Sequence, residues 1–266
     1  MSYIVPGSVI LVPGSVILVT GASGGIGLEV AAQAAEGGAI VGVHGSRVET
    51  VDKAMEKIRA RVPDARLIAA PGNFLEDGMI EQVVERVASE GGRLDAVIHC
   101  AVASSGREGP SGITGPFRSC DPKAFGEAAK NMLGTFQVLS FAALPHLAVN
   151  GGTLVTFASD SGRFAAARQS LVGAAYGGIM SFVRNLAMEV GRDKVRVHCI
   201  SPSYVMDTPV FEKFAAVANR ADRAKERAAL GLPTPRDIAP MTLFLCSPLA
   251  EKITGQIIHI NGGLNA

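Results

Sequence analysis

Short β-type runs alternate with stretches of helical period along most of this 266-residue chain. Successive parallel strands need a long crossover between them, usually a helix, so strict alternation predicts a parallel sheet with helices on both faces. The predicted fold class is therefore α/β, with a doubly wound sheet whose ligands bind at the carboxyl ends of the strands. Strands are expected at residues 16–20, 39–43, 66–70, 94–99, 153–158, 195–200 and 256–260, and helices at residues 28–36, 48–61, 78–89, 125–147 and 171–190.

The start of the chain carries a tandem heptad, VPGSVIL, at residues 5–11 and again at residues 12–18. Only the second copy runs directly into the glycine-rich stretch that follows, so it is expected to begin the first strand. No linker rich in proline, serine or glycine divides the rest of the chain. Two parts are predicted: an extension at residues 1–15 and a single domain at residues 16–266.

Hydrophobic residues make up 48% of the chain and charged residues 18%, which fits a sheet buried on both faces and an oligomer interface. A net charge of +1 offers no field to hold nucleic acid or an anionic membrane, and no apolar run is long enough to span a bilayer. The beginning of the chain lacks the pattern of a secretion signal. Four widely spaced cysteines, Cys100, Cys120, Cys199 and Cys246, predict neither a zinc site nor a disulfide framework, and a cytoplasmic location is expected.

The stretch TGASGGIG at residues 20–27 follows the first strand and opens the first helix. Glycines allow a sharp turn and a close backbone approach to a pyrophosphate, whose charge then faces the helix N-terminus. This context favours a Rossmann-like dinucleotide site, and a tight turn without a ligand is the alternative. The cofactor-binding residues expected in the turn are Thr20, Gly21, Ser23, Gly25, Ile26 and Gly27.

The chain resembles the short-chain dehydrogenase/reductase family from Val16 to Gly263. The order and spacing of several segments carry the resemblance together, since none of them is decisive alone. The resemblance implies a single Rossmann-like domain, NAD or NADP as cofactor, and a substrate lid at about residues 204–232. The matching segments are LDAVIHCA at 94–101, NMLG at 131–134, RNLA at 184–187, ISP at 200–202, PRDIA at 235–239, ITGQ at 253–256 and NGG at 261–263.

The choice of cofactor, and cofactor binding itself, are open at this stage. In NAD-preferring members of the family an acidic residue ends the second strand, and that place falls here on Gly45, with Arg47 two residues further on. Arg47 either pairs with the 2′-phosphate of NADP or faces solvent at a helix start. The resemblance adds Asn73 to the cofactor-binding positions. The family's Asn-Asn-Ala-Gly reads His-Cys-Ala-Val here, from His99, and these larger side chains leave open that no cofactor binds.

By the same resemblance, the chemistry needs four groups: a tyrosine that exchanges a proton with the substrate oxygen, a lysine that lowers the tyrosine's pKa, a serine and an asparagine. Ser159 and Asn131 match the serine and the asparagine. The tyrosine place, thirteen residues after the serine, is Val172, and the lysine place, four residues further on, is Tyr176. The segment RNLAME at residues 184–189 then follows without a gap, which supports this register.

A rival register makes Tyr176 the catalytic tyrosine. It needs a four-residue insertion before Tyr176 and a compensating deletion after it, and it puts Met180 at the lysine place. A tyrosine without a neighbouring cation keeps a pKa of roughly 10 and is a poor base at neutral pH. Three functions are therefore open: a non-catalytic subunit, an oxidoreductase that uses Tyr176 with Ser159, and a nucleotide-binding sensor without turnover.

The non-catalytic interpretation implies a partner. Some dehydrogenases of this family, acting on hydroxyacyl-CoA substrates, pair an inactive chain with a catalytically competent short-chain dehydrogenase paralogue. A hetero-oligomer, a tetramer, is expected on this basis, with no nucleic acid and no membrane as partners. Small residues gather in the first turns of the helix at 171–190 and predict a face that packs closely against another element. They are Gly173, Ala174, Ala175, Gly177 and Gly178.

Two further sets of residues each have two interpretations. The basic residues of the lid either attract a phosphate-bearing substrate such as a CoA ester or form a solvated helix face. They are Lys213, Arg220, Arg223, Lys225 and Arg227. The histidines have no partner acid at a meaningful spacing in the sequence, so a structural role is expected for them in preference to a catalytic one. They are His44, His99, His146, His198 and His259.

Overall fold

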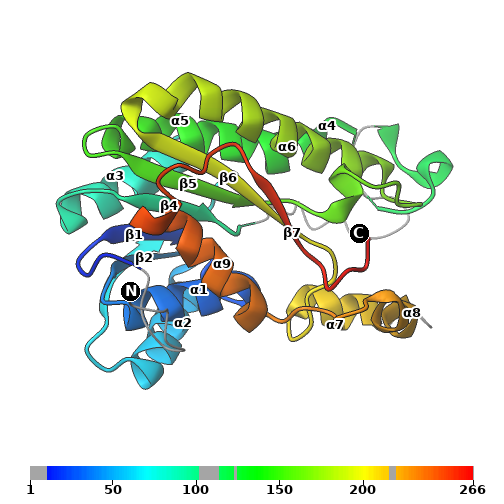
Figure 1. The fold of residues 1–266 in the computed structure, drawn as a ribbon, viewed down its shortest axis with the longest axis horizontal. Helices are drawn as coiled ribbons and strands as arrows, with labels where there is room; N and C mark the ends of the chain where they lie inside the picture. The colour runs from blue at the N-terminus through cyan, green and yellow to red at the C-terminus, as the bar shows by residue number, and fades with distance from the viewer. Residues whose placement is uncertain (1–10, 102–113, 123–124, 216–219, 266) are drawn as a thin grey trace.

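The computed structural model describes residues 11–101, 114–122, 125–215 and 220–265, and folds them around one seven-stranded sheet (Figure 1). All the strands pair in parallel, in the order β3-β2-β1-β4-β5-β6-β7. The strand order reverses between β1 and β4, which confirms the predicted doubly wound sheet. The strands are β1 (Val16–Thr20), β2 (Ile40–Gly45), β3 (Arg66–Pro71), β4 (Ala96–His99), β5 (Gly152–Phe157), β6 (Val195–Pro202) and β7 (Ile257–Ile260).

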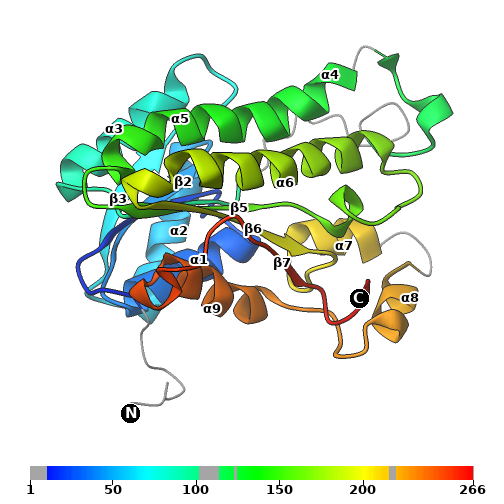
Figure 2. The same ribbon diagram turned by 45° about the horizontal axis from the view of Figure 1, so that its top comes forward.

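Helices cover both faces of the sheet (Figures 1 and 2). One face carries α3 (Met79–Gly91), α5 (Thr135–Leu147) and α6 (Ser170–Val190), and the other carries α1 (Gly25–Glu36), α2 (Val48–Arg61) and α9 (Pro235–Cys246). Three shorter helices complete the described chain: α4 (Phe125–Ala128), α7 (Pro209–Ala215) and α8 (Arg220–Arg227). None of the helices in the described ranges combines the length and the apolar character that crossing a bilayer requires.

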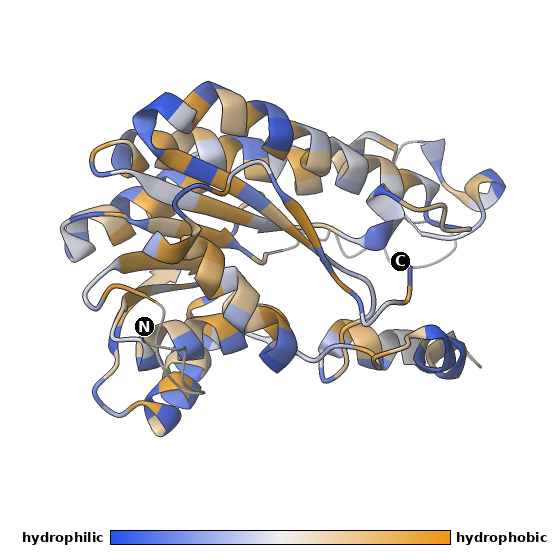
Figure 3. Ribbon diagram, viewed as in Figure 1, coloured by the Kyte–Doolittle hydropathy of each residue, from blue (hydrophilic) through white to orange (hydrophobic). Residues whose placement is uncertain are grey.

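The sheet is buried on both faces, as its apolar strands predict. All five residues of β1 are buried, and Val19 is in register with Val43 on one side and with Ile98 on the other. Phe136 and Leu139 of α5 are fully buried in the core on one face, and Ile58 of α2 in the core on the other face. Figure 3 shows the apolar strands in the middle of the molecule. Each such side chain stabilises the fold by about 1.5–3 kcal/mol relative to an exposed position.

The helix predicted at residues 125–147 is present over that range, and its middle is π-helical, at Ala129–Gly134 between α4 and α5. The hydroxyl of Thr135, the first residue of α5, donates a hydrogen bond of 2.9 Å to the carbonyl of Asn131 in this π turn. A π turn accommodates an extra residue within a helix and is frequent at functional sites. The hydrophobic period does not reveal it, because the pattern resumes on the same face afterwards.

The helix α9 was not predicted, although the sequence carries a signal for it. Pro235 stands at its first position, where a missing N–H costs no hydrogen bond. The backbone N–H of Thr234 donates to Oδ2 of Asp237 at 2.7 Å, which is half of a capping box. This N–H, together with the Thr234 hydroxyl, lowers the pKa of Asp237.

The strand β1 begins within the second copy of the duplicated heptad, as predicted. Leu11, the last residue of the first copy, is buried against the core beneath α1 and α9. Residues 5–10 of the first copy lie outside the described part of the chain.

Three histidines are buried in the strands: His44 at the end of β2, His99 at the end of β4 and His198 in β6. Burial lowers their pKa values, to about 4 for His44 and His198 and to about 3 for His99. His198 differs from His44 in its partners. The backbone of Ile253 raises the pKa of His198 slightly, but neither ring nitrogen forms a hydrogen bond with a described residue.

Replacing His198 with leucine should flatten the acid side of the stability profile. The pKa of His198 is lower in the folded chain than the unfolded value of roughly 6.5. The unfolded chain therefore takes up the proton first as the pH falls, and stability present above pH ~6.5 is lost towards pH ~4. His198→Leu should reduce the slope of the unfolding free energy, measured with urea between pH 6 and 5, by up to about 1.4 kcal/mol per pH unit.

The matched control is His44→Leu, because His44 uses both ring nitrogens. Its Nε2–H donates to the carbonyl of Gly72 at 2.9 Å, and its Nδ1 accepts from the N–H of Gly21 at 3.2 Å. In addition to any change in pH slope, His44→Leu should lower the unfolding free energy at pH 7 by about 1–3 kcal/mol, because the buried partners of His44 are left unpaired. An unchanged pH slope in His198→Leu would contradict the assignment of His198 as a neutral buried group.

Candidate active site

The glycine turn between β1 and α1 is held by close backbone contacts. Gly21 has φ +68°, and a Cβ there would lie 2.7 Å from the backbone nitrogen of Ala101. A Cβ on Gly27 would lie 2.3 Å from the carbonyl oxygen of Gly21. Gly24, the N-cap of α1, has no capping side chain and nothing within 4 Å of its Cβ position. The N–H groups of the first turn of α1 are therefore open to an anion, which fits the pyrophosphate of a dinucleotide.

Two of the buried histidines support this turn. Nδ1 of His44 accepts the N–H of Gly21, and the hydroxyl of Thr20 bonds Nδ1 of His99 at 2.8 Å. The ring of Phe74 stacks on His44 with centroids 4.0 Å apart and lies 6.5 Å from His99. These uncharged rings fix the ends of β1, β2 and β4 relative to one another. His99 therefore positions the turn from inside the protein.

The other predicted residues of the turn are placed differently from one another. Gly25 has φ +53°, and its Cβ position is 3.4 Å from the side chain of Thr208, which precedes α7. Ser23 is exposed, and Ile26 packs on the core beneath α1. The segment that the sequence assigned to a substrate lid thus approaches the glycine turn.

At the end of β2, where NAD-preferring members of the family carry an acidic residue, this chain has Gly45. No carboxylate is therefore present there to bind a cofactor ribose. A Cβ on Gly45 would be 3.2 Å from the Thr50 hydroxyl and 3.4 Å from Cβ of Ser23, so a carboxylate has little room there. Arg47 is exposed at the N-cap of α2, and Oδ1 of Asn73 accepts the N–H of Leu75 at 3.2 Å after β3. The glycine turn fits a pyrophosphate. Of the positions predicted to bind the cofactor ribose, only Arg47 carries a charge.

Three of the four predicted catalytic places lie at the carboxyl end of β5 and in the first turns of α6. Ser159 is half-buried and precedes the turn η4 (Asp160–Gly162), and Asn131 lies in the π turn before α5. Val172, in the first turn of α6, is only 9% exposed and packs in the core beneath α5 and α6. Tyr176 lies one turn further on, and burial raises its pKa to about 12, with a smaller contribution from Cys199.

The glycines of α6 allow close contacts with other elements of the same chain. A Cβ on Gly173 would lie 2.7 Å from the carbonyl oxygen of Ser161, and a Cβ on Gly162 would lie 2.8 Å from the backbone nitrogen of Gly177. On a neighbouring face, a Cβ on Gly178 would come within 2.9 Å of the side chain of Leu133. The predicted close packing is present, and its partners are η4 and the π turn.

A buried carboxylate beside Ser159 was missed by the sequence reasoning. Asp160 is 3% exposed, its Oδ1 accepts Nδ1–H of His259 at 2.9 Å, and its Oδ2 accepts the amides of Asn261 at 2.8 Å and Asn265 at 2.9 Å. The guanidinium of Arg163 donates to Nε2 of His259 at 2.8 Å, which fixes the tautomer. The expectation that the histidines lack a partner acid is thus wrong for His259. The acid lies 99 residues away in the sequence, so no local motif could reveal it.

A second pair corrects the same expectation for His146. Its Nε2 lies 3.4 Å from a carboxylate oxygen of Glu85, which joins α5 to α3. Both pairs connect separate elements of the fold. Neither brings a histidine with a free ring nitrogen to Ser159.

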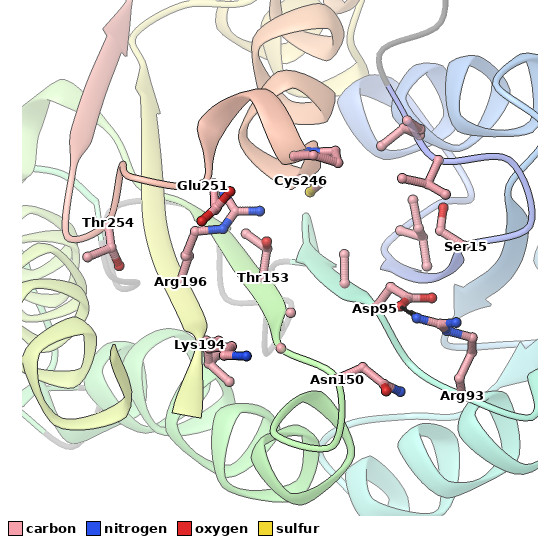
Figure 4. A pocket seen from close by; sticks show the side chains of 18 of the residues that line it. Ser15, Arg93, Asp95, Asn150, Thr153, Lys194, Arg196, Cys246, Glu251 and Thr254 are labelled. Atoms are coloured by element: carbon pink, nitrogen blue, oxygen red, sulfur yellow. Dashed lines mark hydrogen bonds and ion pairs between the residues drawn. The ribbon is translucent and has the colours of Figure 1, made fainter. Parts of the chain in front are cut away.

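One cavity, about 820 Å³ in volume, lies at the amino ends of β1, β4, β5 and β6 (Figure 4). Most of its charged groups already have partners. Arg93 pairs with Asp95 at 2.5 Å and Lys252 with Glu251 at 2.6 Å, while Arg196 donates to carbonyl groups at the end of α9 and just after it. The arginines of this cavity are thus used in contacts within the fold, at the opposite end of the sheet from the glycine turn.

Another cavity, about 480 Å³, lies at the carboxyl end beside Ser159. Asp160 and Asn265 line it, together with Arg168 and, from α8, Arg223 and Arg227. Of the basic lid residues named from the sequence, these two line the cavity and Lys225 does not; the side chains of Lys213 and Arg220 lie outside the described part. Arg168 was not singled out, because nothing local in the sequence distinguishes it from a solvated arginine.

The site can be compared with known proteins. A family model described as Enoyl-(Acyl carrier protein) reductase matches residues 21–265. The chain is 28% identical to the 3-oxoacyl-[acyl-carrier-protein] reductase FabG of Chlamydia muridarum, over 92% of this chain and 94% of that one. It is also 28% identical to the peroxisomal 2,4-dienoyl-CoA reductase SPS19 of Saccharomyces cerevisiae, over 85% of this chain and 74% of that one.

Solved structures share the fold. A short-chain type dehydrogenase/reductase from Mycobacterium ulcerans superposes with a TM-score of 0.87 at 24% identity, covering 96% of this chain and 90% of that one. A 7α-hydroxysteroid dehydrogenase in complex with NADH and 7-oxo glycochenodeoxycholic acid gives a TM-score of 0.84 at 23% identity, covering 96% and 95%. With the family model spanning nearly all of the domain, this chain belongs to the short-chain dehydrogenase/reductase family of oxidoreductases.

Proposed function

We propose that this chain is a non-catalytic subunit of a hetero-oligomeric short-chain alcohol or hydroxyacyl-CoA dehydrogenase. The observation that carries the proposal is the pair of side chains at the start of α6. Val172, at the place of the family's tyrosine, has no proton to exchange and packs in the core. Tyr176, at the place of the lysine, stays protonated near neutral pH because its pKa is about 12. It carries no positive charge that could lower the pKa of a neighbouring group.

The missing groups remove one half of the family's reaction. Hydride moves between the substrate carbon and the nicotinamide, which the bound cofactor supplies, while a proton moves to or from the substrate oxygen. Ser159 and Asn131 remain and can bind that oxygen or a water. They cannot replace an acid–base group, whose loss typically costs about 10²–10⁴-fold in rate.

The partner we propose is a catalytically competent paralogue that retains the serine, tyrosine and lysine, in a hetero-oligomer with the size of a tetramer. Apolar side chains on the outer faces of α5 and α6 support this choice: Val138 is 40% exposed, Phe141 79% and Met188 82%. Large exposed apolar groups on neighbouring helices are typical of a protein interface. The two-subunit (hydroxybenzyl)succinyl-CoA dehydrogenase of anaerobic toluene breakdown is similar in kind, with two family members of which one is catalytic.

A second candidate function is favoured by the glycine turn. The uncapped N-terminus of α1 and the open space at Gly24 fit a pyrophosphate. The backbone N–H groups that begin α1 would hold the phosphates, and Arg47 would lie nearest a 2′-phosphate. A subunit that keeps NAD or NADP in this way without turnover would act as a nucleotide sensor.

The prediction for the catalytic positions concerns Tyr176→Phe in a complex with a paralogue that retains the serine, tyrosine and lysine. If Tyr176 is not catalytic, the kcat of the complex for oxidation of the alcohol should stay within about twofold. If the rival register is right, the loss should be about 10²–10⁴-fold. The control is the variant of the paralogue in which its own catalytic tyrosine is replaced by phenylalanine, and this variant should show the loss of about 10²–10⁴-fold. Steady-state kinetics measures kcat for both complexes.

The second prediction concerns assembly. Phe141→Arg places a charge on the outer face of α5 and should weaken the hetero-oligomer at least about tenfold, because a buried unpaired charge is costly. Native mass spectrometry and sedimentation of the co-expressed chains measure this. Leu230→Arg, at a site that is 90% exposed and outside α5 and α6, is the matched control and should leave the mass unchanged. Equal assembly of both variants would place the interface elsewhere.

The third prediction separates a nucleotide-binding subunit from a structural one. Gly24 has φ −175°, an extended conformation open to any residue, so Gly24→Asp should fold and cap α1. Its carboxylate would repel a pyrophosphate, and NADH binding followed by fluorescence should weaken at least about tenfold, while the neutral Gly24→Asn should bind several-fold more tightly than Gly24→Asp. If the native chain binds no NADH, the second candidate function is rejected.

A further inference from the structure

Positive charge without a partner gathers in the cavity beside Ser159. Arg168 comes from the loop before α6, and Arg223 and Arg227 come from α8, one turn apart. None of the three guanidinium groups forms an ion pair or a side-chain hydrogen bond with any residue of the described chain. The charges of the 820 Å³ cavity at the amino ends of the strands, in contrast, are mostly paired.

The carboxylate in the cavity lining does not balance these arginines. Asp160 is buried, and both of its oxygens already accept hydrogen bonds, from His259 on one side and from Asn261 and Asn265 on the other. Its lone pairs are therefore used within the protein. Three arginines against one carboxylate leave an excess of two positive charges around a cavity of about 480 Å³.

The helix α8, which carries two of these arginines, is held in place by apolar packing. Ala224 and Ala228, between and beside them, are buried in a small cluster with Leu232 and Leu264, and Leu264 also lines the cavity. Arg223 and Arg227 are four residues apart and share one face of the helix, while Lys225 falls on another. The spacing of the basic residues in α8 thus places Arg223 and Arg227 at the cavity and Lys225 away from it.

The rest of the lining is suited to the uncharged part of a ligand. Ser159, Ser203 and Tyr204 contribute hydroxyl groups, and Phe164 and Leu264 contribute apolar surface. The Ser161 hydroxyl, also in the lining, is buried and has no hydrogen-bond partner among the described residues. A cavity with apolar walls, a few hydroxyls and a charged rim is the usual form of a small-molecule site.

We infer that this cavity binds an organic oxyanion, a compound with a carboxylate or a phosphate ester, whose charged group lies at the arginines and whose uncharged part points towards Ser159. The planar guanidinium fork matches both carboxylate and phosphate in a bidentate manner, which is the chemistry that they share. This inference rests on the proposed function only in taking the cavity as the substrate side of the site. Binding there requires no turnover.

The test is a calorimetric titration of the purified chain at constant ionic strength with three probes: succinate, CoA and succinamide. Succinate offers a carboxylate, CoA offers phosphates, and succinamide is the neutral analogue of succinate. We expect succinate or CoA to bind and succinamide not to bind. The double variant Arg223→Gln/Arg227→Gln and the single variant Arg168→Gln should each weaken that binding, the double variant by at least about tenfold.

Lys225→Gln is the matched control, because it removes a cation from the same helix outside the cavity. It should leave the affinity within about twofold, which also separates a local contact from general attraction to a basic helix. Whichever of succinate and CoA binds identifies the carboxylate or the phosphate as the recognised group. Equal binding by all variants, equal binding of succinamide, or no binding of either anion would overturn the inference.

The outcome is independent of the test of Tyr176. If Tyr176→Phe abolishes turnover but the anion still binds through the arginines, the proposed function fails and the assignment of the cavity stands. If Tyr176→Phe leaves the complex active and no anion binds, the proposed function stands and the assignment of the cavity fails.

Discussion

The contact between η4 and α6 is made by backbone on backbone, and the places of Ser159, Val172 and Tyr176 all depend on it. A side chain on Gly162 or Gly173 would collide with the backbone of the facing element at less than 3 Å. Interiors are packed too closely to absorb such a collision by small shifts. The glycines therefore weaken the intrinsic stability of the helix and fix the one approach that brings the end of β5 to the start of α6.

The same turn carries the carboxylate that ties the end of the chain to the site. A buried charge is tolerated only with hydrogen-bond donors around it, and Asp160 takes its donors from His259, Asn261 and Asn265. The backbone N–H of Leu230 then donates to the carbonyl of Gly262, which joins the region after α8 to this C-terminal segment. The C-terminal segment thus connects Asp160 to α8, which carries two of the cavity's arginines. The Asp160 carboxylate helps to place these arginines but does not balance their charge.

Local periodicity and glycine chemistry predict most of the fold, because they act over a few residues. The strands and the glycine turn were predicted from the alternation and from the residues around Gly21 for this reason. The π turn around Asn131 was not, since an inserted residue leaves the hydrophobic pattern intact on both sides. The Asp160–His259 pair was not predictable either, because strand order alone brings residues so far apart in the sequence together. The start of α9 was within reach, since Thr234 and Asp237 stand at capping spacing.

Binding and proton transfer depend on different kinds of group in this site, and this makes the proposed subunit physically consistent. Backbone N–H groups and arginines hold anions at any pH near neutral, so the turn and the cavity need no side chain with a tuned pKa. Proton transfer needs such a side chain, and the proposed subunit lacks it because we assign Val172 and Tyr176 to the two places that supply it. Val172 is a small apolar group in an apolar core, and the Tyr176 ring packs against the same core. In the proposed subunit these two residues would therefore remove the proton transfer while keeping the packing that holds the fold.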